Sequence, residues 1–211
     1  MAVMALYREV HPTHPQERVI QEAVDILRGG GVIVYPTDST YALGCSMGDK
    51  KALDRIRSIR HLEEHHPFTL VCRDLSDLGT YARVSNPSYR ILKALTPGPF
   101  TFILEGTKEV PRRLLDKKRK TIGLRVPDHE VVQMLLNVLG EPLMSSTLVI
   151  PGDEFPLCDP EEIRNRLSHG VDFILNGGAC GLEPTTLIDL TGEKAQLLRQ
   201  GKGDASDFFS V

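Results

Sequence analysis

Apolar residues follow a helical spacing in some segments of the chain and a strand-like pattern in others. After Pro15, which can occupy the first position of a helix, apolar side chains recur every three or four residues as far as Leu27. Three glycines at residues 29–31 then end the predicted helix, and the apolar run at residues 32–35 is typical of a buried strand. The two kinds of segment alternate from here to residue 199.

Capping residues and short apolar runs predict the remaining elements. Asp49 and Asp74 each precede a helical pattern and are predicted N-caps, the first of a helix that ends near Arg60. Helical spacing recurs at residues 131–139 and near residues 160–167. Strands are predicted at residues 68–72, 100–104, 121–126, 143–150, 171–175, 185–190 and 196–199. This order of elements predicts a single α/β domain, with a large sheet and flanking helices.

The composition narrows the class of protein. Hydrophobic residues make up 41% and charged residues 25% of the 211 residues, as in globular proteins and unlike disordered or fibrous chains. No apolar run approaches the ~20 residues that span a bilayer, and no apolar leader follows a basic start, so we expect neither membrane insertion nor secretion. The four cysteines lack the short spacings of zinc or redox motifs, which favours a reducing, cytoplasmic location.

Positive charge is concentrated in one segment of an otherwise acidic chain. The formal net charge of −3 excludes a protein that is basic throughout. Residues 108–120 carry seven basic side chains against Glu109 and Asp116, a net of +5, so the rest of the chain carries −8. Such a cluster suits the phosphates of a nucleic acid, and a solvated loop is the alternative interpretation. The candidate RNA-binding residues are Arg112, Arg113, Lys117, Lys118, Arg119 and Lys120.

Residues 61–65 spell H-x-x-E-H, the pattern of the inverted zinc proteases. Two histidines four residues apart on one helix could bind a metal, but His66 and Pro67 follow at once and favour the end of the helix here. No third ligand follows at a recognisable spacing. We interpret the segment as an exposed polar helix end and predict no protein-bound metal. The two common phosphate-binding patterns, G-x-x-x-x-G-K-[ST] and G-x-G-x-x-G, do not occur in the sequence.

The most unusual segment is residues 35–44, where a buried strand runs into a proline, three hydroxyl residues and an aspartate. Ligand sites commonly lie beyond the carboxyl ends of strands, and hydroxyl groups there can orient a small polar substrate. The alternative is a capped turn that Asp38 and Ser39 hold through side-chain bonds to the backbone. The segment alone leaves both interpretations open.

Residues 35–44 resemble the signature Y-P-T-[DE]-T-x-Y-G-L-G of the YrdC/YciO superfamily. Four further blocks resemble its motifs in family order, at residues 97–101, 121–127, 184–190 and 198–201. The similarity covers roughly residues 15–203, which we take as the YrdC-like domain, with terminal extensions at residues 1–14 and 204–211. Residues 108–120 and 148–149 are most similar to YciO proteins.

The resemblance implies a large twisted sheet with a concave, basic face that is associated with double-stranded RNA or tRNA binding. The best-understood members are L-threonylcarbamoyladenylate synthases, which join L-threonine, bicarbonate and ATP and release pyrophosphate. Their product supplies the threonylcarbamoyladenosine modification of certain tRNAs. This nucleotidyltransferase chemistry would use Mg²⁺ bound with the ATP, and it depends mainly on positioning and charge neutralisation.

The resemblance also implies site residues. Ser39, Arg125 and Thr185 match positions on the threonine side, where the planar fork of Arg125 suits a carboxylate. The positions that match the nucleotide side are Arg60, Thr121, Thr147 and Arg199.

Departures from the family pattern fall mainly on the nucleotide side. The family K-x-R becomes residues 60–62, so that Leu62 replaces a cation, and Val149 replaces the asparagine of S-x-N. His66 replaces a lysine or asparagine, and Val71 replaces a histidine that some members carry. Each lost phosphate donor would cost ~2–4 kcal/mol of transition-state stabilisation if it were used in that way.

The sequence therefore supports two hypotheses of function from different classes. One is an enzyme that forms a carbamoyl adenylate from ATP, bicarbonate and L-threonine or a related amino acid. The other is a protein that binds double-stranded RNA or tRNA and has no synthase activity. A hydrolase that uses the same pocket is a third interpretation, but no residue offers a distinct nucleophile or base, and we assign no catalytic residue. We expect a monomer or homodimer.

Overall fold

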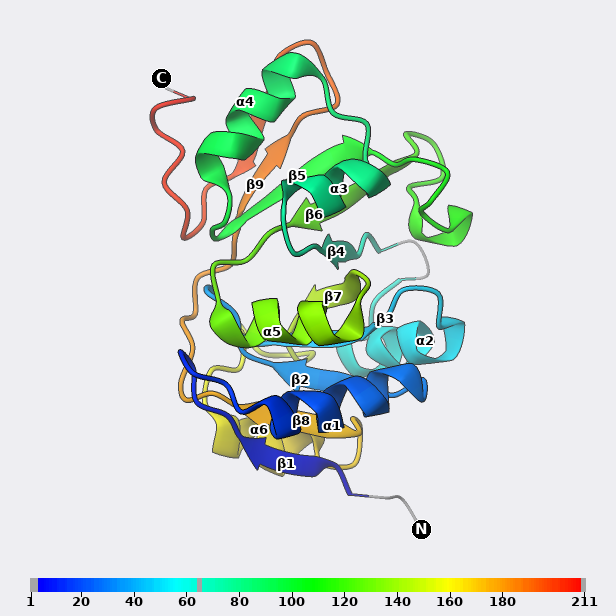
Figure 1. The fold of residues 1–211 in the computed structure, drawn as a ribbon, viewed down its shortest axis with the longest axis vertical. Helices are drawn as coiled ribbons and strands as arrows, with labels where there is room; N and C mark the ends of the chain where they lie inside the picture. Colours follow the sequence, from blue (N-terminus) through cyan, green and yellow to red (C-terminus); the bar gives the residue numbers. More distant parts are fainter. Residues whose placement is uncertain (1–3, 64–65, 210–211) are drawn as a thin grey trace.

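The computed structural model describes residues 4–63 and 66–209, which form one ten-stranded sheet with helices on both sides (Figure 1). The strand order is β1-β8-β2-β3-β7-β4-β6-β5-β9-β10. The strands are β1 (Leu6–Glu9), β2 (Ile33–Tyr35), β3 (Ala42–Ser46), β4 (Thr69–Val71), β5 (Phe100–Glu105), β6 (Thr121–Arg125), β7 (Leu143–Thr147), β8 (Phe173–Asn176), β9 (Thr186–Asp189) and β10 (Gln196–Arg199). The helices are α1 (Glu17–Arg28), α2 (Lys50–Arg60), α3 (Leu75–Tyr81), α4 (Asn86–Leu95), α5 (Glu130–Leu139) and α6 (Pro160–Leu167), with a short 3-10 helix η1 at Arg112–Leu114.

Strand pairs in the sheet run both parallel and antiparallel. β8 pairs parallel with β1 and β2, β4 with β6, and β5 with β9, whereas the other neighbours are antiparallel. The centre is built from segments that are far apart in sequence. Gly44 of β3, for example, pairs with Ser145 of β7, and Ser145 in turn pairs with Thr69 of β4. Long-range pairing therefore brings the candidate motifs onto neighbouring strands.

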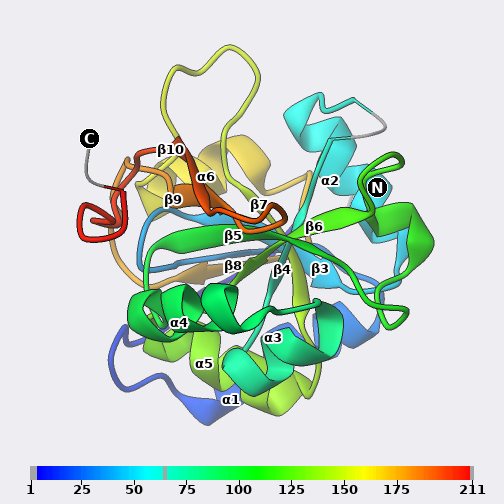
Figure 2. The ribbon, with the colours of Figure 1, turned by 90° about the horizontal axis from the view of Figure 1, so that it is seen from above.

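The helices divide between the two sides of the sheet. Figure 2 shows α1, α3, α4 and α5 on one side and α2 and α6 on the other. Ile20, Val24 and Leu27 of α1 are fully buried, and they join the apolar side of α5 in one core cluster. Spacings of three and four residues put these side chains on one face of α1, which is the pattern that predicted this helix.

The capping residues act as the sequence predicts. The Asp49 side chain accepts a hydrogen bond from the backbone N–H of Ala52 at the start of α2, and Asp74 accepts one from Asp77 at the start of α3. α1 begins at Glu17, two residues beyond Pro15. The strand predicted at residues 143–150 ends at Thr147, because the chain then leaves the sheet in a loop.

Three elements were absent from the sequence-based prediction. Residues 6–9 were assigned to a terminal extension, but they form the edge strand β1 beside β8. No strand was predicted at residues 42–46, but they form the buried strand β3. A Cβ at Gly44 would lie 2.8 Å from side-chain atoms of Tyr35 and Leu143, so a small residue is needed there for close packing. α4 begins after Ser85, which accepts a hydrogen bond from the backbone of Ser88.

Candidate functional site

A cavity of about 790 Å³ lies on one face of the sheet. Its wall includes side chains from β3, β7, β4, β6, β5 and β9, which are consecutive in the sheet. Alternate residues of these strands face it, as the two-residue period of a strand requires. The alternate lining residues on β4, β5, β6 and β7 are Thr69 and Val71, Thr101 and Ile103, Thr121, Gly123 and Arg125, and Ser145 and Thr147. Ile122 of β6 and Ser146 of β7 also reach the wall.

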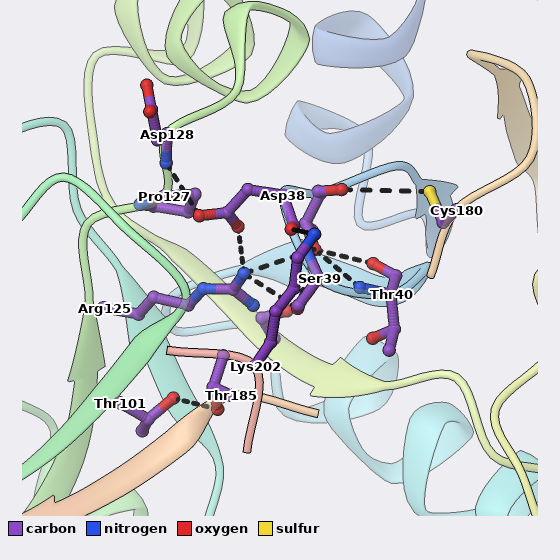
Figure 3. A network of polar contacts seen from close by, with 12 residues as sticks. Asp38, Ser39, Thr40, Thr101, Arg125, Pro127, Asp128, Cys180, Thr185 and Lys202 are labelled. Carbon is purple, nitrogen blue, oxygen red and sulfur yellow. Dashed lines mark hydrogen bonds and ion pairs between the residues drawn. The ribbon is translucent and has the colours of Figure 1, made fainter. Parts of the chain in front are cut away.

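Arg125 and Asp38 form a buried ion pair at the carboxyl end of β6. Their side chains are only 10% and 9% exposed. The Nη2 of Arg125 donates to Asp38, to the Ser39 hydroxyl at 2.9 Å and to the Thr37 hydroxyl at 3.3 Å (Figure 3). The second carboxylate oxygen of Asp38 accepts the backbone N–H of Asp128 at 3.0 Å. Thr37, Asp38 and Ser39 therefore fix the position of the Arg125 guanidinium group, and Asp128 holds Asp38 in place.

The other edge of this guanidinium group carries a nitrogen that makes no hydrogen bond to the described residues. Arg125 lines the cavity, and its Nε is buried without a hydrogen-bond partner among the described residues. A buried donor that lacks a partner costs free energy, which a ligand that accepts its hydrogen bond would recover. The orphaned Nε therefore identifies a position where an anionic oxygen can bind.

The turn between β2 and β3 is held by Thr37 rather than by Asp38 and Ser39, the residues that the capped-turn alternative named. The Thr37 hydroxyl accepts the backbone N–H groups of Ser39 and Thr40, both at 3.2 Å, and donates to the Thr40 carbonyl at 2.6 Å. This frees Asp38 for Arg125. The Nζ of Lys202 donates to the Asp38 carbonyl, so that the C-terminal segment also braces the turn (Figure 3).

Thr185 lies across the cavity from this turn, just before β9. Its hydroxyl is hydrogen-bonded to that of Thr101 at 2.8 Å (Figure 3). Arg199 donates from Nη2 to the Thr185 carbonyl at 2.9 Å and also lines the cavity. A residue predicted on the amino-acid side and one predicted on the nucleotide side are therefore in direct contact.

The C-terminal end of α2 contributes cations to another part of the wall. Arg60 donates to the Ser146 hydroxyl and to the Val149 carbonyl, the latter at 3.3 Å from Nε. Arg57, one turn earlier, lies 5.4 Å from the centroid of the Phe68 ring. Burial lowers the pKa of Arg60. The pKa of His66 is also lowered, first by burial and then by repulsion from Arg60 and Arg57, so this imidazole is neutral at pH 7.

The residues of the basic cluster differ in whether they line the cavity. Four of its six candidate residues line the wall, whereas Lys118 and Lys120 do not. Arg119 Nη2 also bonds the Asp189 carboxylate and the Thr191 hydroxyl, each at 2.6 Å. The four lining residues are Arg112, Arg113, Lys117 and Arg119.

The carboxylates in the cavity wall are Asp116 and Glu154. Within residues 4–63 and 66–209, no group of three or more His, Cys, Asp or Glu side chains could hold a metal ion. A Mg²⁺ ion that accompanies ATP keeps most of its ligands as water and phosphate oxygens, and it needs one or two carboxylates at most. The two acidic residues fit that requirement.

Most of the predicted site residues meet in this cavity. Ser39 does not line it, since its buried hydroxyl accepts a hydrogen bond from Arg125. The H-x-x-E-H segment follows the end of α2, because α2 stops at Arg60 and His61 adopts a left-handed conformation. Glu64 and His65 of that motif lie outside the described residues. The predicted residues that line the cavity are Arg60, Thr121, Arg125, Thr147, Thr185 and Arg199.

Sequence reasoning missed the ion-pair role of Asp38, the second α2 cation Arg57, and the two exposed apolar residues Phe155 and Leu182 in the cavity wall. Asp38 lies within the recognised motif, and Arg57 precedes Arg60 by one helical turn, so both had a local signal. Phe155 and Leu182 lie in loops and had none.

Comparison with known proteins identifies the family. A family profile described as telomere recombination, which groups Sua5, YciO and YrdC proteins, matches residues 25–201. The chain belongs to the Sua5/YciO/YrdC family. Within the described residues of this family member, no helix is long and apolar enough to cross a membrane.

Relatives within the family differ in their similarity to this chain. YciO of Escherichia coli is 56% identical over 205 residues, which cover 97% of this chain and all of the relative. Its crystal structure matches with a TM-score of 0.94 at 55% identity over 98% of this chain and all of that chain. A threonylcarbamoyl-AMP synthase of Vibrio vulnificus is 29% identical, covering 86% of this chain and 98% of the enzyme.

A structure of P. abyssi Sua5 complexed with L-threonine shares the fold. Its TM-score is 0.85 at 24% identity, and the match covers 93% of this chain and 58% of that chain. The single α/β domain with a large sheet that was predicted from the sequence is therefore confirmed, as is the family resemblance.

Proposed function

We propose that this protein binds ATP and a small L-amino acid similar to threonine, and joins them through a carbamate to form an acyl adenylate. The amine attacks bicarbonate and water is lost, which gives the carbamate. A carbamate oxygen then attacks the α-phosphate of ATP and displaces pyrophosphate. The products are the carbamoyl adenylate, pyrophosphate and water, so that atoms and charges balance.

The observation that carries this proposal is the orphaned Nε of Arg125 in the wall of a cation-rich cavity. A planar guanidinium group with a free edge suits a carboxylate. The Thr185 hydroxyl in the same wall is hydrogen-bonded to the Thr101 hydroxyl at 2.8 Å. The hydroxyl group of a substrate can join such a pair. Both groups favour a small hydroxy amino acid.

The relatives support the same chemistry. The Vibrio vulnificus relative is a threonylcarbamoyl-AMP synthase, and P. abyssi Sua5 has been crystallised with L-threonine. Arg60, Thr121, Thr147 and Arg199 line the cavity and can contact ATP. Stabilisation of the charge that develops on the α-phosphate by such fixed donors is the main source of catalysis that we propose.

Two substitutions set the expected rate. Leu62 packs against the core, and Val149 presents an apolar side chain to the cavity. If the family uses both positions as phosphate donors, their loss costs ~2–4 kcal/mol each. We therefore expect a slow synthase in which Arg60 and Thr147 retain part of the original nucleotide site.

Pyrophosphate release tests the proposal directly. The assay contains ATP, Mg²⁺ and bicarbonate, with or without L-threonine, and compares the wild type with a Leu62→Arg/Val149→Asn variant. We expect slow threonine-dependent release from the wild type and faster release from the variant. Arg125→Met/Asp38→Asn in the restored background, which removes both charges of the buried ion pair, is the inactive control. No threonine-dependent release from the wild type at high enzyme concentration would exclude the proposed reaction.

A second candidate function is the binding of double-stranded RNA or tRNA. It is favoured by Lys118 and Lys120, which belong to the basic cluster but lie outside the cavity wall. Phosphate contacts of this kind release counterions, so affinity for RNA should fall steeply with salt. Replacement of both lysines by alanine should reduce the salt dependence, and an unchanged salt dependence would count against this function.

A further inference from the structure

The cavity wall carries far more positive than negative charge. Eight arginine and lysine side chains line it, against the carboxylates of Asp116 and Glu154. Three of the cations are paired with acidic side chains behind the wall, through Arg57–Asp54, Arg119–Asp189 and Arg125–Asp38. Arg112 has no carboxylate partner among residues 4–63 and 66–209. Arg60 and Arg199 donate to uncharged groups, and the connection between β5 and β6 supplies four of the eight cations in the wall.

This connection is anchored although its cations are exposed. Leu114 of η1 is 8% exposed and belongs to the main core cluster, and Leu115 packs against the same cluster. A Cβ at Gly106 would lie 2.4 Å from Leu115, so the leucine sits directly on the backbone there. The Asp116 carboxylate accepts the backbone N–H groups of residues 118 and 119 at 2.9 and 2.6 Å. These contacts hold the neighbouring cations at the cavity wall.

The direction of β6 orders the cavity from end to end. Arg125, the proposed carboxylate partner, is at its last residue, and Thr121, which adjoins the basic connection, is at its first. Four residue steps along a strand span ~13 Å. In the proposed reaction the α-phosphate lies next to the amino acid at Arg125, and a triphosphate that runs along β6 has its β- and γ-phosphates toward Thr121. The charge on the connection is therefore at the end where the terminal phosphates lie.

We propose that Arg112 and Lys117 bind the β- and γ-phosphates of ATP and replace the cation that is missing at Leu62. This inference rests on the proposed function, since it uses the same nucleotide. Leu62 packs against the core and is absent from the cavity wall, whereas both cations line it. The basic cluster then has two parts. Arg112 and Lys117 face the cavity, and Lys118 and Lys120 do not.

A pair of matched double variants tests the inference. Arg112→Ala/Lys117→Ala and Lys118→Ala/Lys120→Ala each remove two positive charges from the same segment. Arg113 is left intact because its guanidinium group donates to the Gly48 carbonyl and contributes to the fold. Binding of ATP, ADP and AMP is measured by isothermal titration calorimetry with Mg²⁺ at fixed ionic strength. Thermal unfolding and L-threonine binding serve as controls for folding.

We expect the Arg112/Lys117 variant to bind ATP about tenfold or more weakly than the wild type. The two charge-assisted contacts to phosphate together contribute at least that factor to the affinity. Its affinity for AMP should remain within about twofold of the wild type, and the Lys118/Lys120 variant should bind all three nucleotides normally. Equal losses in both variants would mean nonspecific attraction and would overturn the inference. Equal losses for ATP and AMP would overturn the assignment to the terminal phosphates.

The failure of this inference can be distinguished from the failure of the proposed function. If the wild type prefers ATP to AMP but releases no pyrophosphate, the phosphate site is retained and the proposed reaction is excluded. If the wild type releases pyrophosphate and both variants bind ATP as tightly as the wild type does, the proposed reaction is retained and the phosphate site is overturned. A double-stranded RNA oligonucleotide, titrated into both variants, gives a third result. RNA affinity lost in both, with ATP affinity unchanged, assigns the whole cluster to RNA.

Discussion

The two ends of the cavity hold their cations in different ways. At the Arg125 end, a single guanidinium group is buried between two motifs, and its ion pair with Asp38 is about nine-tenths removed from solvent. At the η1 end, Arg112 and Lys117 are exposed residues on an anchored connection. The first arrangement fixes geometry at the cost of desolvation, and the second supplies charge at little cost.

This difference separates selectivity from attraction. A buried donor such as the Arg125 Nε discriminates between ligands, because a ligand that lacks an acceptor leaves the donor unpaired. Exposed cations attract any polyanion and are screened by salt. We therefore expect substitutions at the Arg125 end to affect folding and amino-acid binding together. Substitutions at the η1 end should change nucleotide affinity and its salt dependence while stability stays the same.

The largest effect is expected from Arg125→Met. This change leaves the Asp38 carboxylate buried without its partner, which should lower the free energy of unfolding by ~3–5 kcal/mol. L-Threonine binding should also be lost. Urea denaturation and calorimetry measure the two effects. Arg125→Met/Asp38→Asn should recover most of the stability without recovering binding, and a stable single variant would contradict the buried-pair account.

Local patterns predicted much of the fold but missed two strands, β1 and β3. α1 and α5 were predicted because their apolar residues recur at helical spacing and are buried. β1 was missed because its burial does not alternate, with both ends exposed and both central residues half-buried. β3 was missed because Gly44 and Ser46 have low strand propensity, and its stability comes from β2 and β7 on either side.

The candidate site was predictable as a set of residues but not as an arrangement. Family motifs indicated Arg125 and Thr185, and both line the cavity. The pairing of Arg125 with Asp38 joins residues 87 positions apart, so no local pattern encodes it. The direction that the basic segment faces was equally hidden. A run of exposed cations has the same sequence pattern whether it lines a cavity or faces solvent. The packing of Leu114 and Leu115 determines which way the segment faces.

A smaller effect is expected from Thr185→Val. The change removes one partner of the 2.8 Å hydrogen bond with Thr101, whose hydroxyl is left in a largely buried position. An unpaired buried hydroxyl costs ~1–3 kcal/mol, so the free energy of unfolding should fall by that amount. Thr101→Val/Thr185→Val should cost less than the sum of the two single changes. Strictly additive effects in a denaturation-based cycle would show that the two hydroxyls do not interact.

The smallest effect is a pH dependence that His66 should confer on nucleotide binding. Burial and the nearby Arg60 and Arg57 lower the pKa of His66, so the folded protein takes up this proton at a lower pH than the unfolded chain. The contribution of His66 to stability is therefore complete above the unfolded pKa of ~6.5 and is lost as the pH falls from there through the folded pKa. Phosphates bound in the same cavity oppose the repulsion from the arginines and should raise the pKa of His66.

Nucleotide binding should then be coupled to proton uptake. As the pH falls from about 7 to about 6, the ATP affinity of the wild type should rise relative to that of His66→Gln, by at most about tenfold, because a single linked proton changes an affinity by no more than that per pH unit. Comparison of the two proteins in the same buffers cancels the titration of ATP itself. Calorimetry in buffers of different ionisation enthalpy counts the protons taken up. Equal proton uptake by the wild type and the variant would place the bound phosphates away from His66. Because His66, Arg57 and Arg60 line the same wall, the phosphates would then also lie away from the α2 end of the cavity.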